Sequence, residues 1–216
     1  MIAIIDYGMG NLKSVVNACI KLGAEVEITS EKEVIKHSKA LILPGVGAFG
    51  KCIANLKGLK LLDVIKGMIQ DNKPYLGICL GMQVLFDESE ESPGVSGMGI
   101  IKGTVPRFKD AMKVPHMGWN SITKLKDHDI FKGIKSGEHF YFVHSYYCQP
   151  EEEDVIVTTT TYGITFASSV QKGNLFACQF HPEKSQAAGL HLLKNFIDLT
   201  REHRHQNELY GAREGS

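Results

Sequence analysis

Short apolar runs alternate with amphipathic segments in the N-terminal part of the chain. Each run has four or five residues, the length of a buried strand, and is followed by turn residues and then by apolar residues at helical spacing. Strands that are apolar throughout are typical of a parallel sheet covered by helices on both faces. Ser30 and Glu33 have the spacing of a capping box, which predicts that Ser30 opens the second helix. We predict strands at 2–5, 24–28, 40–43 and 75–78, and helices at 12–22, from Ser30, at 49–56, at 59–70 and from Leu80.

The pattern changes after Asp87, where an acidic loop leads into segments rich in β-branched and aromatic residues. We predict that these segments are mixed or antiparallel strands that extend the same sheet. The fold class is therefore α/β, with a central, mostly parallel sheet, helices on both faces and an added antiparallel region. The predicted strands lie at 121–125, 140–143, 154–161 and 175–180.

Ser185 is predicted to open a last helix, and its apolar face identifies the side that packs on the sheet. Residues 1–200 then form one domain. Residues 201–216 are polar and contain glycine, so we expect a flexible tail. The predicted apolar face consists of Leu192, Leu193, Phe196 and Ile197.

Composition restricts the classes of function. Lys plus Arg and Asp plus Glu both number 24, so a net charge of zero gives no sign of a polyanion-binding surface. Five scattered cysteines indicate thiols in a reducing compartment, and nine scattered histidines do not form a metal-binding pattern. The first apolar run is too short for a signal segment and no run approaches a membrane span, so the sequence predicts a cytoplasmic protein without metal or cofactor.

Residues 75–83 have the pattern of a nucleophile elbow. A buried strand ends at Cys79, and apolar residues at helical spacing follow from Leu80. Gly77 and Gly81 flank the cysteine at i−2 and i+2, where a Cβ atom would crowd a sharp turn. A thiol at such a turn lies near a helix N-terminus, which favours the thiolate. By itself the motif would more often contain a small buried structural cysteine than a catalytic one.

A thiolate nucleophile needs a base, and the base needs an orienting partner. His181 and Glu183 follow an apolar strand and are separated by one proline. In an extended chain residues i and i+2 point the same way, so the Glu183 carboxylate would lie beside the His181 ring. His181 alone would more often be structural, but together with Glu183 and an elbow cysteine it is a candidate base.

Residues 44–49 follow a buried strand and contain two glycines, Gly45 and Gly47. Such a loop presents backbone N–H groups to a ligand, and a thioester mechanism needs an oxyanion hole. We expect the N–H of Leu80 and this loop to supply the donors, although a simple turn would have the same composition. A dinucleotide site is disfavoured, because Lys13 stands where the pattern after Gly8 and Gly10 requires a small residue.

Residues 77–83 together with 181–183 resemble the class I (triad) glutamine amidotransferases. The stretches 6–12, 44–49, 116–120 and 142–146 make the chain similar, from residue 1 to about 200, to the glutaminase subunits of imidazole glycerol phosphate synthase. The resemblance implies a flavodoxin-like fold and a thioester mechanism in which Cys79 attacks glutamine, His181 transfers protons and Glu183 holds the imidazole. It assigns the oxyanion donors to Val46, Gly47 and Leu80, and the glutamine contacts to Gly47, Gln83, Glu91, Ser145 and Tyr146.

Among these contacts Glu91 is ambiguous, because Glu88 and Glu90 are close by in the sequence. Ser145 stands where the family commonly has threonine, which keeps the hydroxyl. The resemblance also implies a heterodimer with a (β/α)₈-barrel cyclase that uses the ammonia to make imidazole glycerol phosphate and aminoimidazole carboxamide ribonucleotide in histidine biosynthesis. The residues that match the partner-facing surface are Asn11, Trp119, Tyr141 and Lys184.

Two alternatives remain open at this point. A paralogous amidotransferase subunit would deliver ammonia to another acceptor, for example in surface-sugar synthesis. A catalytically silent scaffold would bind a partner through the same fold, although it would have no need of Cys79, His181 and Glu183 together. Trp119, the only tryptophan, is equally compatible with the core and with an interface.

Overall fold

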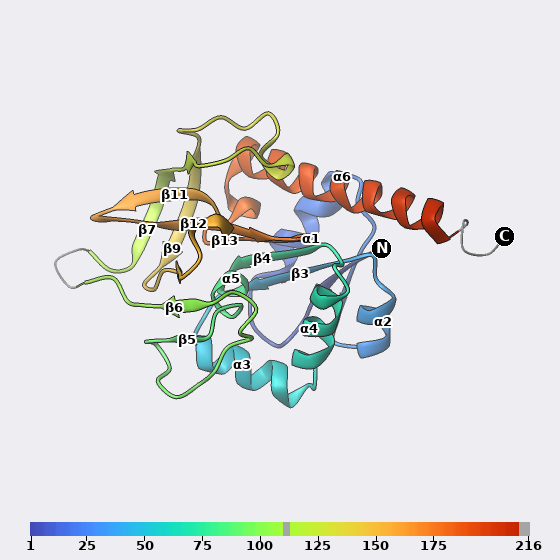
Figure 1. Cartoon of the computed structure of the whole chain (residues 1–216), viewed down its shortest axis with the longest axis horizontal. Coiled ribbons are helices and arrows are strands. Elements are labelled where there is room, and N and C mark those ends of the chain that lie inside the picture. Colours follow the sequence, from blue (N-terminus) through green and yellow to red (C-terminus); the bar gives the residue numbers. More distant parts are fainter. Residues whose placement is uncertain (110–112, 212–216) are drawn as a thin grey trace.

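The computed structural model describes residues 1–109 and 113–211, with side chains described as far as Arg201 in the last helix. An eight-stranded sheet forms the middle layer, with the strand order β2-β1-β3-β4-β13-β12-β11-β8. The first five strands in this order are parallel and the last three are antiparallel, as the sequence predicts (Figure 1). These strands are β1 (Ile2–Ile5), β2 (Val26–Thr29), β3 (Ala40–Gly45), β4 (Tyr75–Cys79), β8 (Thr123–Lys124), β11 (Ile156–Tyr162), β12 (Ile164–Lys172) and β13 (Leu175–Cys178).

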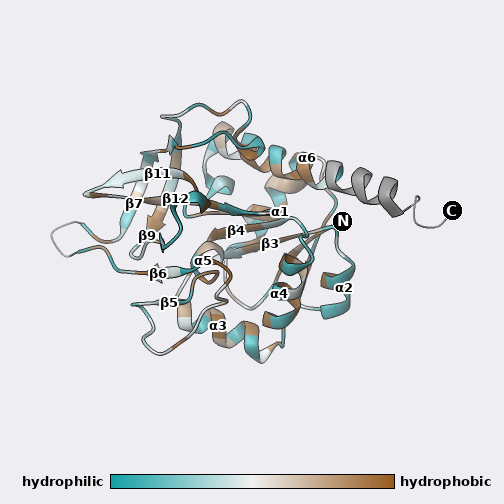
Figure 2. Cartoon of the chain, viewed as in Figure 1, coloured by the Kyte–Doolittle hydropathy of each residue, from teal (hydrophilic) through white to brown (hydrophobic). Residues whose placement is uncertain are grey.

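Helices cover both faces of the sheet, because its parallel strands are apolar on both sides. In β1, Ala3 and Ile5 pack with one set of helices, and Ile2 and Ile4 pack with the other. The brown colour of β3 and β4 in Figure 2 shows that these inner strands are apolar. On one face lie α2 (Lys32–His37), α3 (Phe49–Gly58) and α4 (Leu62–Gln70); on the other lie α1 (Leu12–Lys21) and α6 (Gln186–Gly211).

The start of α2 differs from the sequence prediction. The helix begins at Lys32, its N-cap is Glu31, and no side chain caps it. The side-chain hydrogen bond just before the helix comes from Thr29 instead, because its hydroxyl oxygen accepts the Glu31 backbone N–H at 3.0 Å. The predicted capping box of Ser30 and Glu33 is therefore wrong, since strand β2 runs on to Thr29 and delays the helix.

The antiparallel region contains more strands than the sequence indicates. The prediction missed β12, the longest strand, because its buried Ser168 and Ser169 interrupt the apolar alternation. The hairpin of β7 (His116–Ser121) and β9 (His139–His144) projects beside the main sheet, and a small sheet combines β10 (Gln149–Pro150), β6 (Gly103–Val105) and β5 (Glu88–Ser89). Short helical turns lie at η1 (Asp129–Phe131), η2 (Glu153–Val155) and η3 (Pro182–Lys184).

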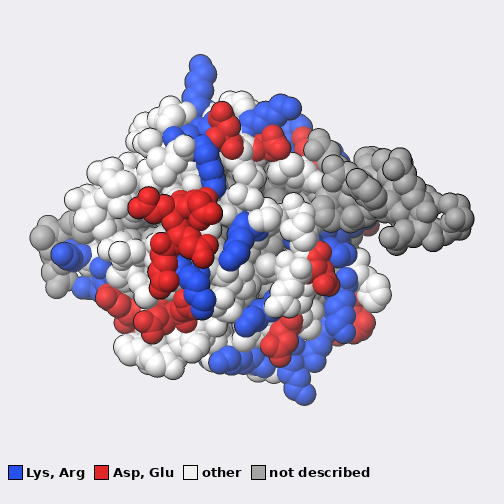
Figure 3. All heavy atoms as spheres, viewed as in Figure 1, with Lys and Arg blue, Asp and Glu red and all other residues white. Residues whose placement is uncertain are grey.

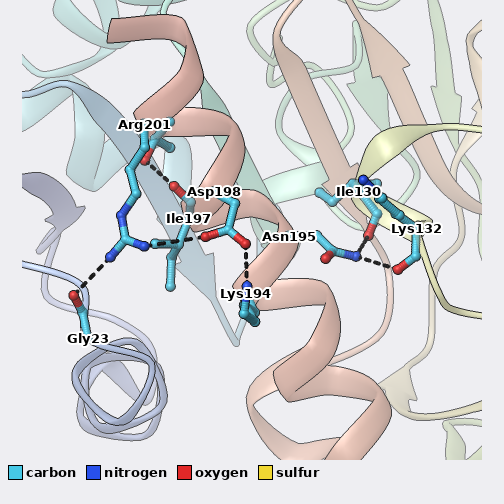
Figure 4. A network of polar contacts seen from close by, with 9 residues as sticks. Gly23, Ile130, Lys132, Lys194, Asn195, Ile197, Asp198 and Arg201 are labelled. Atoms are coloured by element: carbon cyan, nitrogen blue, oxygen red, sulfur yellow. Dashed lines mark hydrogen bonds and ion pairs between the residues drawn. The ribbon is translucent and has the colours of Figure 1, made fainter. Parts of the chain in front are cut away.

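Helix α6 is held by polar contacts in addition to its apolar face (Figure 4). The Asn195 side chain donates to the carbonyl oxygens of Ile130 and Lys132 at 3.0 and 2.9 Å. Arg201 donates to the Gly23 carbonyl oxygen at 3.1 Å and pairs with Asp198. These bonds attach the helix to the η1 turn on one side and to the end of α1 on the other.

The helix continues past the predicted domain boundary after residue 200, as far as Gly211. Polar composition predicts exposure to solvent. It does not by itself predict the end of a helix, because Arg, Glu and Gln are also good helix formers. Flexibility of residues 201–216 stays a prediction.

On the face shown in Figure 3, acidic side chains gather in one group left of the centre, and basic and other acidic side chains are scattered around it. Within the described ranges, no helix combines the length and the apolar character needed to cross a membrane. The same residues contain no group of three His, Cys, Asp or Glu side chains placed to hold a metal ion.

Candidate active site

Cys79 occupies the predicted elbow between β4 and α5 (Leu80–Gln83). Its backbone has φ 54° and ψ −105°, a strained conformation for a residue with a side chain. A Cβ on Gly77 would lie 2.5 Å from the Gly81 carbonyl oxygen, and a Cβ on Gly81 would overlap the Leu43 carbonyl oxygen. The flanking glycines are therefore required by close backbone packing. Helix α5 is a single turn, so its dipole contributes little to the thiol.

His181 and Glu183 form a buried pair at the exit of β13. The His181 Nδ1 and Glu183 Oε1 atoms are 2.8 Å apart, and both side chains are at most 3% exposed. The sequence argument assumed an extended chain, whereas Glu183 lies in the η3 turn, which brings the two side chains together by curling back. The Ser185 hydroxyl fixes this turn, because it donates to the His181 carbonyl oxygen at 2.6 Å and accepts the Tyr141 N–H at 2.9 Å.

The environment of His181 favours its charged form. Burial lowers the pKa of His181, but the neighbouring Cys79 and the Glu183 carboxylate outweigh burial and raise that pKa to about 10. Because the carboxylate can only accept, Nδ1 carries a proton and Nε2 is the nitrogen left for chemistry. Nε2 is buried without a hydrogen-bond partner. Such a site can hold an imidazolium beside a thiolate.

A cavity of about 300 Å³ opens at Cys79. It collects side chains from β4, α5, the loop after β3, the acidic loop and the end of β9. Pro115, Val143 and His144 also line it and were not predicted. The predicted oxyanion and glutamine-contact positions that line it are Val46, Gly47, Leu80, Gln83, Glu91, Ser145 and Tyr146.

The loop between β3 and α3 is shaped by the loop that follows β1. Gly47 has φ +111°, and a Cβ there would overlap the Met9 methyl group. Tyr7 donates its hydroxyl to the Pro44 carbonyl oxygen at 3.1 Å. The loop after β1 thus contacts residues 44–47, and the positive φ of Gly47 favours glycine at that position.

The three acidic residues, between which the sequence did not decide, differ in their contacts. Glu91 lines the cavity, and its Oε2 atom accepts the Phe49 N–H at 2.7 Å at the start of α3. Glu90 instead accepts the Arg107 N–H at 2.8 Å, and Glu88 is exposed. Because Ala48, the N-cap of α3, provides no side-chain bond, the acidic loop supplies the cap of that helix.

A chain of polar contacts that the sequence analysis missed leads away from the cavity. Gln83 Nε2 and His144 Nδ1 both donate to the Tyr146 carbonyl oxygen, at 3.0 and 2.8 Å. His144 Nε2 lies 2.9 Å from His116 Nδ1, and His116 Nε2 lies 3.2 Å from the Asn120 amide nitrogen. The carbonyl and the amide at the two ends fix the tautomers, so His116 donates to His144 and accepts from Asn120.

Both histidines of this chain are neutral. Burial lowers the pKa of His116 to about 4 and that of His144 to about 3. The His116 ring is also stacked between Phe142 and Tyr162, with centroid distances of 4.9 and 4.1 Å. The pair therefore belongs to an aromatic core that forms one wall of the cavity.

Three of the four predicted partner-facing residues lie together. Trp119 and Tyr141 are paired across β7 and β9 with ring centroids 6.2 Å apart, and Lys184 Nζ lies 6.0 Å above the Tyr141 ring. Trp119 is 47% exposed, so its reading as a core residue is wrong. Asn11 is the N-cap of α1, where its side chain accepts the Ser14 N–H, and α1 packs against the η3 turn that carries Lys184.

Comparisons with known proteins identify the family and the fold. The family described as glutamine amidotransferase class-I matches residues 3–199. The chain is 50% identical over 201 residues to the imidazole glycerol phosphate synthase subunit HisH of Methanothermobacter thermautotrophicus, covering 93% of this chain and 100% of that protein. It is 52% identical to HisH of Methanocaldococcus jannaschii, with coverages of 92% and 100%. A crystal structure of a glutamine amidotransferase has the same fold, with a TM-score of 0.73, 21% identity, and coverages of 92% and 98%.

Proposed function

The chain belongs to the class-I glutamine amidotransferase family, and on that premise we propose that it is the glutaminase subunit of imidazole glycerol phosphate synthase. The observation that carries the proposal is the placement of an elbow thiol at a cavity, with a buried His181–Glu183 pair beside it. The identity to HisH proteins over nearly the whole chain supports the choice among amidotransferases.

The reaction begins with the Cys79 thiolate, which attacks the side-chain amide carbon of glutamine. The carbonyl oxygen becomes an oxyanion and accepts hydrogen bonds from the Leu80 N–H and from the Val46–Gly47 segment. The His181 imidazolium then transfers its Nε2 proton to the departing nitrogen, and ammonia and a glutamyl thioester result. Neutral His181 next takes a proton from water, the hydroxide attacks the thioester, and glutamate leaves. The thiolate and imidazolium are restored.

The other residues of the cavity bind and orient glutamine. Glu91 provides a negative charge for the α-ammonium group, at the place where its Oε2 atom already accepts the Phe49 N–H. Gln83, Ser145 and Tyr146 also line the cavity. This arrangement holds the amide carbon near Cys79 while the polar ends of the substrate are recognised.

The ammonia passes to a cyclase subunit with a (β/α)₈ barrel, which docks on the face that carries Trp119, Tyr141 and Lys184. Exposed Met117 lies on the same strand as Trp119, two residues away, so the two side chains share one face of β7. Exposed aromatic and thioether side chains are common at protein interfaces. The exposed Val46 adjoins the reacting centre, so docking can act on the oxyanion loop.

Glutamate release from glutamine tests the proposal, measured for the chain alone and with the cyclase plus its nucleotide substrate. We expect stimulation of about tenfold or more by the partner. Cys79→Ala should lower the stimulated rate by at least about 10³-fold, because the thioester cannot form. Cys52→Ala, a change of another buried cysteine in α3, is the matched control and should retain activity.

Different failures have different meanings. Glutamine hydrolysis that does not respond to this cyclase would point to a paralogous subunit with another acceptor. Absence of hydrolysis under every condition, in folded protein, would favour the silent scaffold. Stimulated activity that survives Cys79→Ala would contradict the mechanism.

A further inference from the structure

Gln179 is a buried polar residue whose part in the site no motif assigned. It directly follows β13, two residues before His181, and its side chain is inaccessible to solvent. Its Nε2 atom lies 3.5 Å from Cys79 Sγ, and its Oε1 atom lies 3.2 Å from Gln83 Nε2. The Gln179 backbone N–H donates to the Ser168 carbonyl oxygen at 2.9 Å, so the residue is held by the neighbouring strand β12.

The orientation of the Gln179 amide follows from hydrogen-bond chemistry. The Gln83 amide contacts the Tyr146 carbonyl oxygen, which can only accept, so the Gln83 atom there is the NH₂ group. The same NH₂ group also faces Gln179, which must therefore present its oxygen to Gln83. The Gln179 NH₂ group is left to point at the Cys79 sulfur.

An N–H donor aimed at a buried sulfur stabilises the thiolate more than the thiol, because the charged form is the stronger acceptor. Apart from the His181 imidazolium, other sources of such stabilisation are weak here. Helix α5 is only one turn long, and no Lys or Arg lines the described cavity. Gln179 donates an N–H to the sulfur, and His181 lies close enough to Cys79 for the two groups to affect each other's charge.

We propose that Gln179 is a further member of the catalytic machinery, which holds the Cys79 thiolate by donating an amide N–H and ties it to the glutamine-binding residue Gln83. The catalytic part of this proposal rests on the proposed function, because it assumes that the site hydrolyses glutamine. The effect of the Gln179 hydrogen bond on the reactivity of Cys79 can be measured without glutamine or a partner.

The test is the rate of Cys79 alkylation by iodoacetamide as a function of pH, with Cys79→Ala as the blank for the other cysteines. In Gln179→Met the midpoint of the profile should move up by about one pH unit, so the rate at pH values below the wild-type midpoint should fall about tenfold. The plateau at high pH should stay within about twofold of the wild type. A merely structural role would change the plateau and leave the midpoint in place.

Gln179→Glu is the second variant, since its carboxylate keeps an acceptor for Gln83 but places a negative charge toward the sulfur. Its midpoint should move up at least as far as that of Gln179→Met, and it carries the test if the methionine variant does not fold. Gln171→Met, at a half-buried position on β12, is the matched control and should show the wild-type profile. Midpoints within about 0.2 pH unit of wild type in both Gln179 variants would overturn the proposal.

Steady-state kinetics separate Gln179 from Gln83. Gln179→Met should lower kcat with little change in KM for glutamine, whereas Gln83→Met should raise KM and keep the alkylation midpoint. If the Gln179 variants shift the alkylation midpoint but the wild-type chain never hydrolyses glutamine, the role of Gln179 stands and the proposed function is wrong. If the chain is an active glutaminase but the Gln179 variants leave the midpoint unchanged, the proposed function stands and the role of Gln179 is wrong.

Discussion

The two halves of the sheet build the site in different ways. In the parallel half, around β3 and β4, the buried strand residues are apolar and the nucleophile is placed by backbone packed against backbone. In the antiparallel half and the β7–β9 hairpin, several buried residues are polar, and the cavity wall is held by directed hydrogen bonds. The close backbone packing of the parallel half has no room for an added atom. The antiparallel half is instead sensitive to the loss of a hydrogen-bond partner.

The same contrast appears between two buried histidines. His181 faces a carboxylate and Cys79, which raise its pKa to about 10 against the effect of burial. For His144 burial prevails and lowers the pKa to about 3, because its partners are a carbonyl oxygen and another neutral histidine. Burial alone therefore does not determine the charge of a histidine; the neighbours decide between a proton carrier and a neutral structural ring.

The largest effect is expected from an added methyl group in the parallel half. In Gly81→Ala the new Cβ would overlap the Leu43 carbonyl oxygen, and neither backbone can move without disturbing the elbow. We expect a loss of about 4 kcal/mol or more in the free energy of unfolding. The measurement is urea denaturation of the purified chain.

Gly67→Ala, in helix α4, is the matched control, because nothing lies within 4 Å of its added Cβ. It should stabilise the chain by about 0.4–1 kcal/mol. Equal effects of the two substitutions would mean that close packing at the elbow is not what makes Gly81 necessary.

A smaller effect is expected from the pH dependence of the His116–His144 pair. Both rings have a pKa in the folded chain well below the usual 6.5, so the unfolded chain binds more protons in acid. Their stabilisation is present above about pH 6.5 and is lost as the pH falls toward their folded pKa values of about 4 and 3. We expect the pair to lower the free energy of unfolding by roughly 2–3 kcal/mol between pH 6.5 and 5.

Urea denaturation at these two pH values measures the loss. The double variant His116→Asn/His144→Asn removes both titrating rings and should show a smaller decrease, whatever its absolute stability. His139→Asn makes the same change at an exposed position of β9 and should keep the wild-type decrease. If the double variant lost as much stability in acid as the wild type, titrating groups other than these two histidines would be responsible for the loss.

The comparison also explains what the sequence could predict. Cys79, His181 and Glu183 were identified because glycine spacing and a strand end are local signals, and the parallel strands were identified because they are apolar throughout. Gln179 and the His116–His144 pair were missed, because their partners lie 96 and 28 residues away in the chain and no local pattern encodes them. Strand β12 was missed for the same reason: the burial of Ser168 and Ser169 depends on a hydroxyl from another strand, which no local pattern encodes.

The smallest effect concerns that hydroxyl, on Thr158 of β11. It lies 2.8 and 2.7 Å from the Ser168 and Ser169 hydroxyls, and all three residues are fully buried. Thr158→Val keeps the shape but leaves the two serines without this partner, so we expect a loss of about 1–2 kcal/mol in urea denaturation. Thr161→Val, at an exposed position of the same strand, should change stability by less than about 0.5 kcal/mol. If Thr158→Val were as neutral as its control, apolar packing alone would hold the antiparallel half, and the contrast with the parallel half would disappear.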